Sequence, residues 1–158
     1  MEAKYIYPKD FIRNVLIGEL KDVVFKHAYL SFALIAVGIE YLGKCNMTTH
    51  QDWHNINPSN AFDEGLNLLS SIDQRYADVN LNLKDSLRNG FAHTLSPKSK
   101  IGLSEIKHGA EHFKPASDGK ITMVVEYLFA DFVKVCNIIL NKEFPENDKM
   151  NKPILEIK

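Results

Sequence analysis

The chain has 158 residues and a mass of 18.0 kDa, which suffices for one domain with a hydrophobic core and is too little for two of ordinary size. Hydrophobic residues make up 45% and charged residues 25%, so disordered and collagen-like classes are excluded. The 19 basic and 20 acidic residues leave a net charge of -1. This excludes a strongly basic nucleic-acid coat protein, although it leaves room for a local basic site.

The cysteines and the apolar stretches indicate a cytoplasmic protein. Cys45 and Cys136 are too few for a disulfide scaffold, so we expect a reducing environment. The first nine residues lack the apolar core of a signal peptide. The longest apolar stretch, residues 28–42, contains Ser31 and Glu40 and is shorter than the ~20 residues of a membrane span. It predicts a buried core helix, and no membrane association is expected.

Helical periodicity begins at residues 8–25, where Pro8 and the following Lys and Asp are typical of a helix start. A second helix is predicted over about residues 27–42, and Gly43 is expected to end it. Because this helix is apolar on most sides, it should lie at the centre of a bundle or in a subunit interface.

Residues 44–60 are polar and irregular and predict a connecting loop, in which Trp53 would be an anchor that packs on the helices. A third helix is predicted to start near residues 58–61, with Asn57 or Ser59 as its N-cap. A fourth is predicted over about residues 81–95, because its leucines and Phe91 are spaced by four.

Residues 97–120 differ from the rest because they are rich in glycine and proline and contain a Ser-Asp-Gly turn signal. Here the apolar residues of 101–106 predict a short strand paired with residues 112–114. We therefore expect a β-hairpin or an irregular excursion between the last two helices.

A last long helix is predicted over about residues 121–140, and residues 141–158 form a tail that is either loose or a strap across the fold. Together these elements predict an all-α fold, an antiparallel bundle of about five helices. It should form a single domain over residues 1–158, with its core at about residues 8–140.

The fourth predicted helix contains Arg88-Asn89-Gly90-Phe91-Ala92-His93. An Arg, a polar residue and then a His after three more residues, near the end of a helix in a small all-α chain, resembles the signature of the HEPN superfamily (higher eukaryotes and prokaryotes nucleotide-binding). The resemblance implies an all-α homodimer without a cofactor, which in many members is a metal-independent endoribonuclease and in others is not catalytic. It also implies Arg88, Asn89 and His93 as the catalytic residues.

These residue types suit RNA cleavage without a metal ion. The reaction needs a proton taken from the ribose 2′-OH, a stabilised phosphorane and a proton given to the leaving 5′-oxygen. The imidazole of His93 titrates near neutral pH and can act as the general base or acid. The guanidinium of Arg88 matches phosphate oxygens and stays charged, and Asn89 can orient the imidazole or a substrate oxygen by hydrogen bonding.

The spacing limits how one chain can use the motif. Arg88 and His93 are five residues apart, about 140° around an α-helix, so they converge only if the Arg side chain wraps or the helix distorts near Gly90. A two-fold dimer would instead bring one chain's His beside the other chain's Arg, with the exposed side of the second or fourth helix as the interface. Gly90 costs about 1 kcal/mol in mid-helix, which predicts the close approach of a partner helix.

Lys84, Lys98 and Lys100 are candidate ligands for RNA phosphates. With Arg88, and with Asp85 as the one acidic residue of segment 84–100, they give a local charge of +3. The alternatives are an ordinary solvated helix face, an ion pair of Arg88 with Asp85, and a histidine that interacts with the last helical carbonyls.

Two His-x3-His pairs, His50/His54 and His108/His112, would be metal ligands if they lay on helices. Neither pair falls in a predicted helix, so we expect exposed loop histidines and no metal. A metal-binding bundle through these pairs is a third hypothesis about function.

The leading hypothesis is a HEPN-like homodimer that cleaves RNA without a metal ion, in a toxin–antitoxin or phage-defence context. Its partners would be RNA or a nucleotide, and an antitoxin or other protein. The alternative is a non-catalytic HEPN-like module that binds a nucleotide or a partner, or serves only as a structural dimer. The near-neutral net charge favours the alternative slightly.

Overall fold

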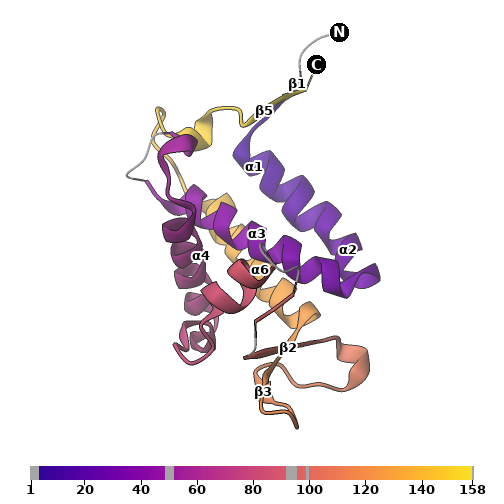
Figure 1. Ribbon diagram of the computed structural model, residues 1–158. Coiled ribbons are helices and arrows are strands. Elements are labelled where there is room, and N and C mark those ends of the chain that lie inside the picture. Colours follow the sequence, from indigo (N-terminus) through magenta and orange to yellow (C-terminus); the bar gives the residue numbers. More distant parts are fainter. Residues whose placement is uncertain (1–3, 49–51, 92–95, 99, 158) are drawn as a thin grey trace.

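A computed structural model describes residues 4–48, 52–91, 96–98 and 100–157 of the chain. The described part is mostly helical with a few short strands. In Figure 1 the helices gather around the central α3 (Ala28–Asn46). The ribbon of β1 (Lys4–Ile6) and β5 (Leu155–Ile157) lies with both termini at one end, and the remaining strands lie at the other end.

The first predicted helix forms and runs without a break through α1 (Pro8–Phe11), the π-helical η1 (Ile12–Glu19) and α2 (Leu20–Lys26). Proline suits the first position because its missing N–H would have no helical partner there. In η1 the N–H groups bond to carbonyls five residues earlier, as from Leu20 to Val15. The buried side chains recur at every fourth position and pack against the rest of the bundle: Ile12, Leu16, Leu20 and Val24.

The second predicted helix forms as α3, but the expectation that Gly43 ends it is wrong, because the helix continues to Asn46. A Cβ at Gly43 would lie 1.7 Å from the carbonyl oxygen of Ala61 in α4 (Pro58–Ile72). The glycine therefore serves a close helix contact rather than a helix stop. The start of α4 is as predicted, since the Asn57 side chain accepts a hydrogen bond of 2.9 Å from the Ser59 N–H.

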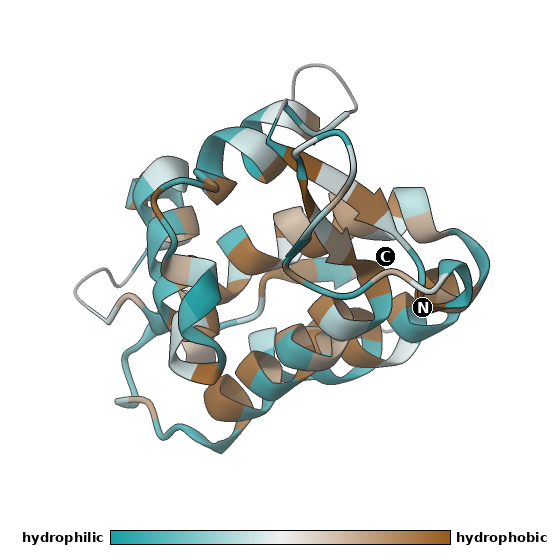
Figure 2. Cartoon of the chain, turned by 90° about the horizontal axis from the view of Figure 1, so that it is seen from below, coloured by the Kyte–Doolittle hydropathy of each residue, from teal (hydrophilic) through white to brown (hydrophobic). Residues whose placement is uncertain are grey.

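The packing of α3 against α4 is the most extensive between any two described elements. It is reciprocal: a Cβ at Gly65 of α4 would lie 2.1 Å from the carbonyl oxygen of Ile39 in α3. Two glycines facing opposite backbones allow the helices to approach more closely than side chains of ordinary size permit. Around this contact the buried apolar side chains form one core, and in Figure 2 hydrophobic and hydrophilic residues alternate along the helices that enclose it.

The loop after α3 confirms the prediction for Trp53, which lies in the short helix η2 (Trp53–Asn55). Its indole stacks on the Tyr41 ring, with centroids 5.5 Å apart and planes inclined by 6°. Lys149 covers the indole with its Nζ 5.6 Å from the ring centroid. The loop is thus held between α3 and the tail.

The tail is a strap rather than a loose end. Lys149 lies in η6 (Lys149–Asn151) and is fully buried, and its Nζ donates to the carbonyl of Met47 at 2.6 Å. Burial lowers the pKa of this ammonium group below its usual range. Further on, β5 pairs antiparallel with β1, so the two ends of the chain are joined.

The last predicted helix starts later than expected. Residues 121–124 form the strand β4 (Ile121–Val124), and α6 (Val125–Asn141) follows at once. β2 (Ile101–Ser104) pairs parallel with β4, and β3 (Lys114–Pro115) pairs antiparallel with its other edge. The predicted pairing of residues 101–106 with 112–114 is therefore wrong, because β4 lies between them. Three of the four residues of β4 are β-branched, which favours a strand over a first helical turn.

By length and composition alone α3 is a candidate membrane span, and half of the relevant window is buried inside the molecule. The core helix of a soluble protein meets the same criterion. The other face of α3 is exposed and apolar, with Leu30 and Val37 exposed by 52% and 69%.

Candidate functional site

Arg88 and Asn89 lie in a helix that occupies residues 83–91 of the described chain. Within it η4 (Lys84–Asn89) is π-helical, and the Gly90 N–H donates to the Asp85 carbonyl five residues earlier. The helix therefore distorts, which is one of the ways considered for bringing Arg88 and His93 together, although the distortion precedes Gly90. His93 lies outside the described residues.

The guanidinium of Arg88 is held at two of its edges. Its Nε donates to Oε2 of Glu40 in α3 at 2.9 Å, and its Nη1 donates to the Asn89 side-chain oxygen at 2.9 Å. The alternative pairing of Arg88 with Asp85 does not form in the structure. A guanidinium has five N–H donors, so these two bonds leave three uncommitted to the described residues.

Polar contacts continue on both sides of this pair. Asn89 donates to Oδ1 of Asp85 at 3.3 Å, and Lys98 donates to the same oxygen at 2.9 Å. These bonds hold the pKa of the Asp85 carboxyl below its usual range, with Lys98 as the larger cause. At the other end, Oε1 of Glu40 lies 3.2 Å from Nζ of Lys44. We call the resulting chain of contacts the Arg88 network: Lys44, Glu40, Arg88, Asn89, Asp85 and Lys98.

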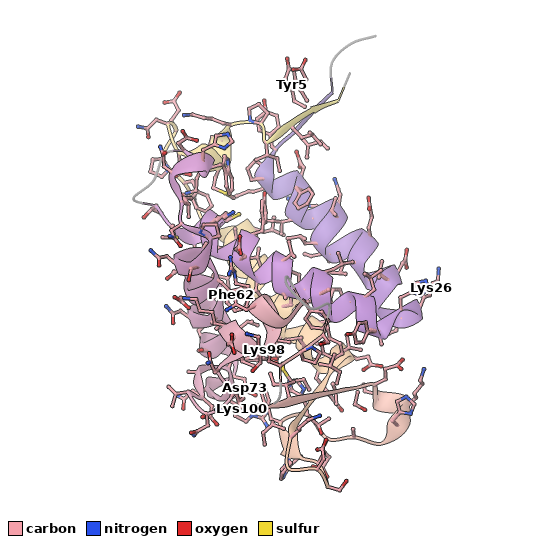
Figure 3. All side chains as sticks on the ribbon, in the orientation of Figure 1. Tyr5, Lys26, Phe62, Asp73, Lys98 and Lys100 are labelled. Carbon is pink, nitrogen blue, oxygen red and sulfur yellow. The ribbon has the colours of Figure 1, made fainter. Side chains whose placement is uncertain are left out.

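The lysines predicted to bind phosphate differ in their surroundings. Lys84 pairs with Asp63 of α4 and Lys98 pairs with Asp85, whereas Lys100 is exposed and makes no ion pair with a described residue. Figure 3 shows Lys98 and Lys100 where the chain passes from the helix of residues 83–91, which we call the motif helix, toward β2. Three residues from α3 and α4 join segment 84–100 through ion pairs: Lys44, Glu40 and Asp63. Together they make five basic and three acidic residues, so the local charge falls from +3 to +2.

Gly90 is explained by the chain's own backbone. A Cβ there would lie 2.5 Å from the carbonyl oxygen of Ser96 and 3.0 Å from the N atom of Lys98. The Lys98 N–H also donates to the Ser86 carbonyl at 3.1 Å. The close approach predicted for a partner helix is thus made by residues 96–98, which fold back over the motif helix.

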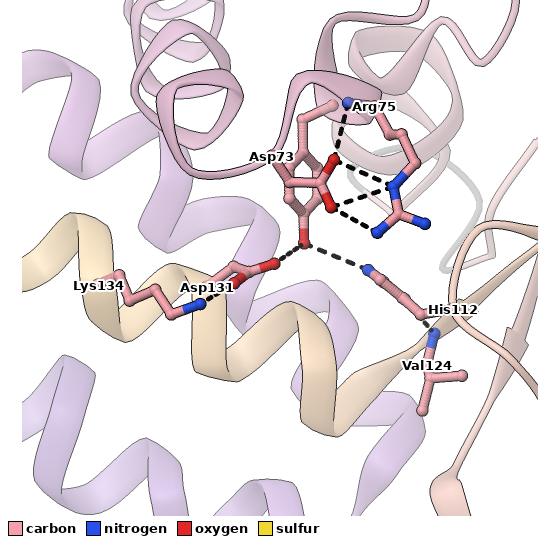
Figure 4. A network of polar contacts seen from close by, with 7 residues as sticks. Asp73, Arg75, His112, Val124, Asp131 and Lys134 are labelled. Atoms are coloured by element: carbon pink, nitrogen blue, oxygen red, sulfur yellow. Dashed lines mark hydrogen bonds and ion pairs between the residues drawn. The ribbon is translucent and has the colours of Figure 1, made fainter.

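A second polar cluster, which the sequence did not predict, surrounds His112 (Figure 4). Tyr76, from η3 (Gln74–Ala77), donates to Oδ2 of Asp131 in α6 at 3.0 Å, and its hydroxyl lies 3.3 Å from Nε2 of His112. The Val124 N–H donates to Nδ1 of His112 at 2.9 Å. Because Nδ1 is an acceptor, the neutral imidazole carries its proton on Nε2 and donates it to the Tyr76 oxygen.

The neutral His112 imidazole therefore links β4 to η3 directly and to α6 through the Tyr76 hydroxyl. Burial lowers its pKa to about 4. Protonation at Nδ1 would also break the hydrogen bond from the Val124 N–H, because two N–H donors would then face each other. Both ring nitrogens are committed to protein partners, so at neutral pH the side chain has no lone pair free for a metal ion or for general-base chemistry.

A cavity of about 470 Å³ adjoins this cluster. Its charged side chains are paired with one another: Arg75 makes three side-chain bonds to the Asp73 carboxylate, and Lys134 donates to Asp131 at 2.8 Å. Arg75 keeps the pKa of Asp73 below its usual range. Because these ion pairs leave no net charge to attract an ionic ligand, we interpret the cluster around His112 as structural.

The histidine pairs do not come together as metal sites in the described structure. His54 and His108 are exposed, the latter 3.5 Å from Glu105, and His50 lies outside the described residues. Among the described residues no group of three or more His, Cys, Asp or Glu side chains is placed to hold a metal ion. Cys45 and Cys136 are buried, and burial raises the pKa of Cys136 to about 12 and that of Cys45 further, so both are neutral thiols.

The pKa of His112 predicts a loss of stability in acid. Its folded pKa is below the unfolded value of 6.5, so the unfolded state binds the proton first, and stability falls as the pH drops from 6.5 toward 4. For this half-buried group we expect a loss of about 1–2 kcal/mol. Urea unfolding at pH 7 and pH 4.5 measures it. In His112→Gln this part of the pH dependence should vanish, whereas His108→Gln should keep it; an unchanged pH dependence in His112→Gln would contradict the assignment.

Searches against protein-family models, curated proteins and solved structures find no match for this chain. The described fold and site therefore define the class by themselves: a mostly helical protein with an Arg–Asn pair in a π-helical turn. The sequence did not predict Glu40 as the partner of Arg88. The available signal was that Glu40 is the one charged residue of the apolar stretch 28–42.

Proposed function

We propose that the chain is a HEPN-like protein and a metal-independent endoribonuclease that acts as a homodimer. The carrying observation is Arg88, which is fixed beside Asn89 in a π-helical turn and has three N–H donors that no described residue engages. π-helical turns occur frequently at functional sites. The packing of the other helices on α3 supports the further proposal that the helices form a single antiparallel bundle.

In this proposal Arg88 binds the scissile phosphate and stabilises the charge that develops on it. His93 takes the proton of the ribose 2′-OH or supplies one to the leaving 5′-oxygen. The attack of the 2′-oxygen on phosphorus breaks the bond to the 5′-oxygen and leaves a 2′,3′-cyclic phosphate and a 5′-hydroxyl. Asn89, which already bridges Arg88 and Asp85, orients these groups. Lys98 and Lys100 would add sequence-independent attraction for the RNA backbone, as would Lys84.

The exposed face of α3 supports the homodimer. Leu30, Leu34 and Val37 are exposed apolar residues of this face, and Leu34 and Val37 line a groove of about 290 Å³ between the first helix and α3. A two-fold dimer pairs the same patch of both subunits, so this apolar face would be buried against its own copy. Val37 lies one helical turn before Glu40, so a second chain on this face would adjoin the Arg88 network. A cytoplasmic toxin or phage-defence role, with an antitoxin as a protein partner, belongs to the same proposal.

One observation favours the non-catalytic alternative, a module that binds a nucleotide or a protein or serves as a structural dimer. Arg88, Lys84 and Lys98 each have a carboxylate partner in their own chain. Internal pairing reduces the attraction that these cations exert on a polyanion.

Incubation of the protein with single-stranded RNA in EDTA tests the proposal. We expect cleavage at neutral pH, and a molar mass of two chains by light scattering. Intact RNA together with a dimer would favour the structural alternative, and a monomer that does not cleave would contradict both the ribonuclease and the structural dimer.

A further inference from the structure

We infer that Glu40 is a positioning residue that orients Arg88 for the phosphate. The inference rests on the proposed function, because that function gives Arg88 its role. It concerns a residue on a different helix from the motif, 48 positions earlier in the chain, which the motif does not include.

The place of Glu40 calls for a reason. It is the one carboxylate of the mostly apolar helix α3, and its side chain is only 21% exposed. A charge in such surroundings is costly unless it is paired and hydrogen-bonded. Both of its oxygens have partners, Oε2 with Nε of Arg88 and Oε1 with Nζ of Lys44.

The geometry fixes the orientation of the guanidinium. Glu40 holds the Nε edge and Asn89 holds one Nη1 hydrogen, both at 2.9 Å, so two bonds on a planar group define its plane. The nearer carboxylate in sequence, Asp85, does not compete because Asn89 and Lys98 engage it. An arginine ordered before binding loses less side-chain freedom when the phosphate arrives.

Lys44 removes the main objection to a carboxylate at a phosphate site. Its Nζ lies 3.2 Å from Oε1 of Glu40, so the pair carries no net charge toward an incoming anion. Glu40 is therefore suited to hold Arg88 without repelling the substrate.

Two substitutions separate positioning from charge. Glu40→Gln and Glu40→Ala remove the same negative charge, but only the glutamine keeps an oxygen that accepts from Nε of Arg88. Binding is measured by the fluorescence anisotropy of a labelled 2′-O-methyl RNA oligonucleotide, which cannot be cleaved through its 2′-oxygen, and kcat and KM are measured on unmodified RNA. Asp118→Ala is the control, because it removes a carboxylate paired with Lys120 in the turn before β4.

We expect Glu40→Ala to weaken binding by about fivefold and to lower kcat, and Glu40→Gln to restore both to within about twofold. Equal values for wild type and Glu40→Ala would overturn the inference, even if the melting temperature fell. Tighter binding by both variants would overturn it too, because Glu40 would then compete with the phosphate.

Arg88→Ala in the same assays distinguishes this inference from the proposed function. If Arg88→Ala loses binding and cleavage while Glu40→Ala keeps them, the positioning role fails and the ribonuclease stands. If Arg88→Ala behaves as wild type, both fail.

Discussion

Gly65→Ala is expected to lower the free energy of unfolding by at least about 3 kcal/mol, and Gly43→Ala by a similar amount. In each case the new methyl group would overlap the backbone of the facing helix, at 2.1 Å from the Ile39 oxygen and at 1.7 Å from the Ala61 oxygen. A backbone cannot swing aside as a side chain can, so α3 and α4 must separate and lose the packing between them.

Urea unfolding followed by circular dichroism measures this loss. The matched control is Gly18→Ala in η1, where the added Cβ meets its nearest neighbouring atom at 3.5 Å. There alanine should be neutral or stabilising by up to about 1 kcal/mol, since glycine is the poorer helix former. A loss below about 1 kcal/mol in both Gly43→Ala and Gly65→Ala would contradict the close crossing of the two helices.

Arg88→Ala and His93→Ala are each expected to lower kcat/KM for RNA by about 100-fold or more, because one removes charge stabilisation and the other proton transfer. Arg88→Lys should not restore activity, since an ammonium group cannot reproduce the contacts of the planar guanidinium. Arg13→Ala is a close control: Arg13 is also followed by Asn and also lies in a π-helical stretch, but it pairs with Asp10 at 3.1 Å.

Mixing the two inactive variants tests how the motifs combine. If one chain's His93 works with the other chain's Arg88, a mixed dimer of Arg88→Ala and His93→Ala holds one site with both residues intact. Activity should then return on mixing and subunit exchange. Its continued absence in a demonstrated mixed dimer would show that the two residues act within one chain.

The sequence predicted the helices well because their apolar residues recur with helical spacing. The first helix, the start of α4 and its Asn57 cap are all readable locally. The end of α3 was not, since Gly43 is a strong local stop signal and its use against Ala61 depends on a helix 15 residues further on. Likewise, the strand at Ile121–Val124 depends on pairing with β2 and β3 on its two edges.

Long-range polar contacts were the least predictable part of the candidate site. The motif pointed to Arg88 and Asn89, but their link to Glu40 requires α3 and the motif helix to pack together. Lys149 shows the same limit, because a lysine in a polar tail predicts exposure and is here fully buried against Trp53 and Met47. Tertiary packing, which local pattern does not encode, decides both.

Cleavage through a ribose 2′-oxygen, by a motif that needs no metal ion, is the step that defines the proposed function. Its most direct test is a DNA oligonucleotide with a single ribonucleotide, incubated in EDTA with the wild-type protein and with His93→Ala. We expect the wild type to cut once, on the 3′ side of the ribonucleotide, and to leave a 2′,3′-cyclic phosphate. We expect His93→Ala to leave the strand intact. Cutting at deoxynucleotides, or equal cutting by both proteins, would contradict the proposed function.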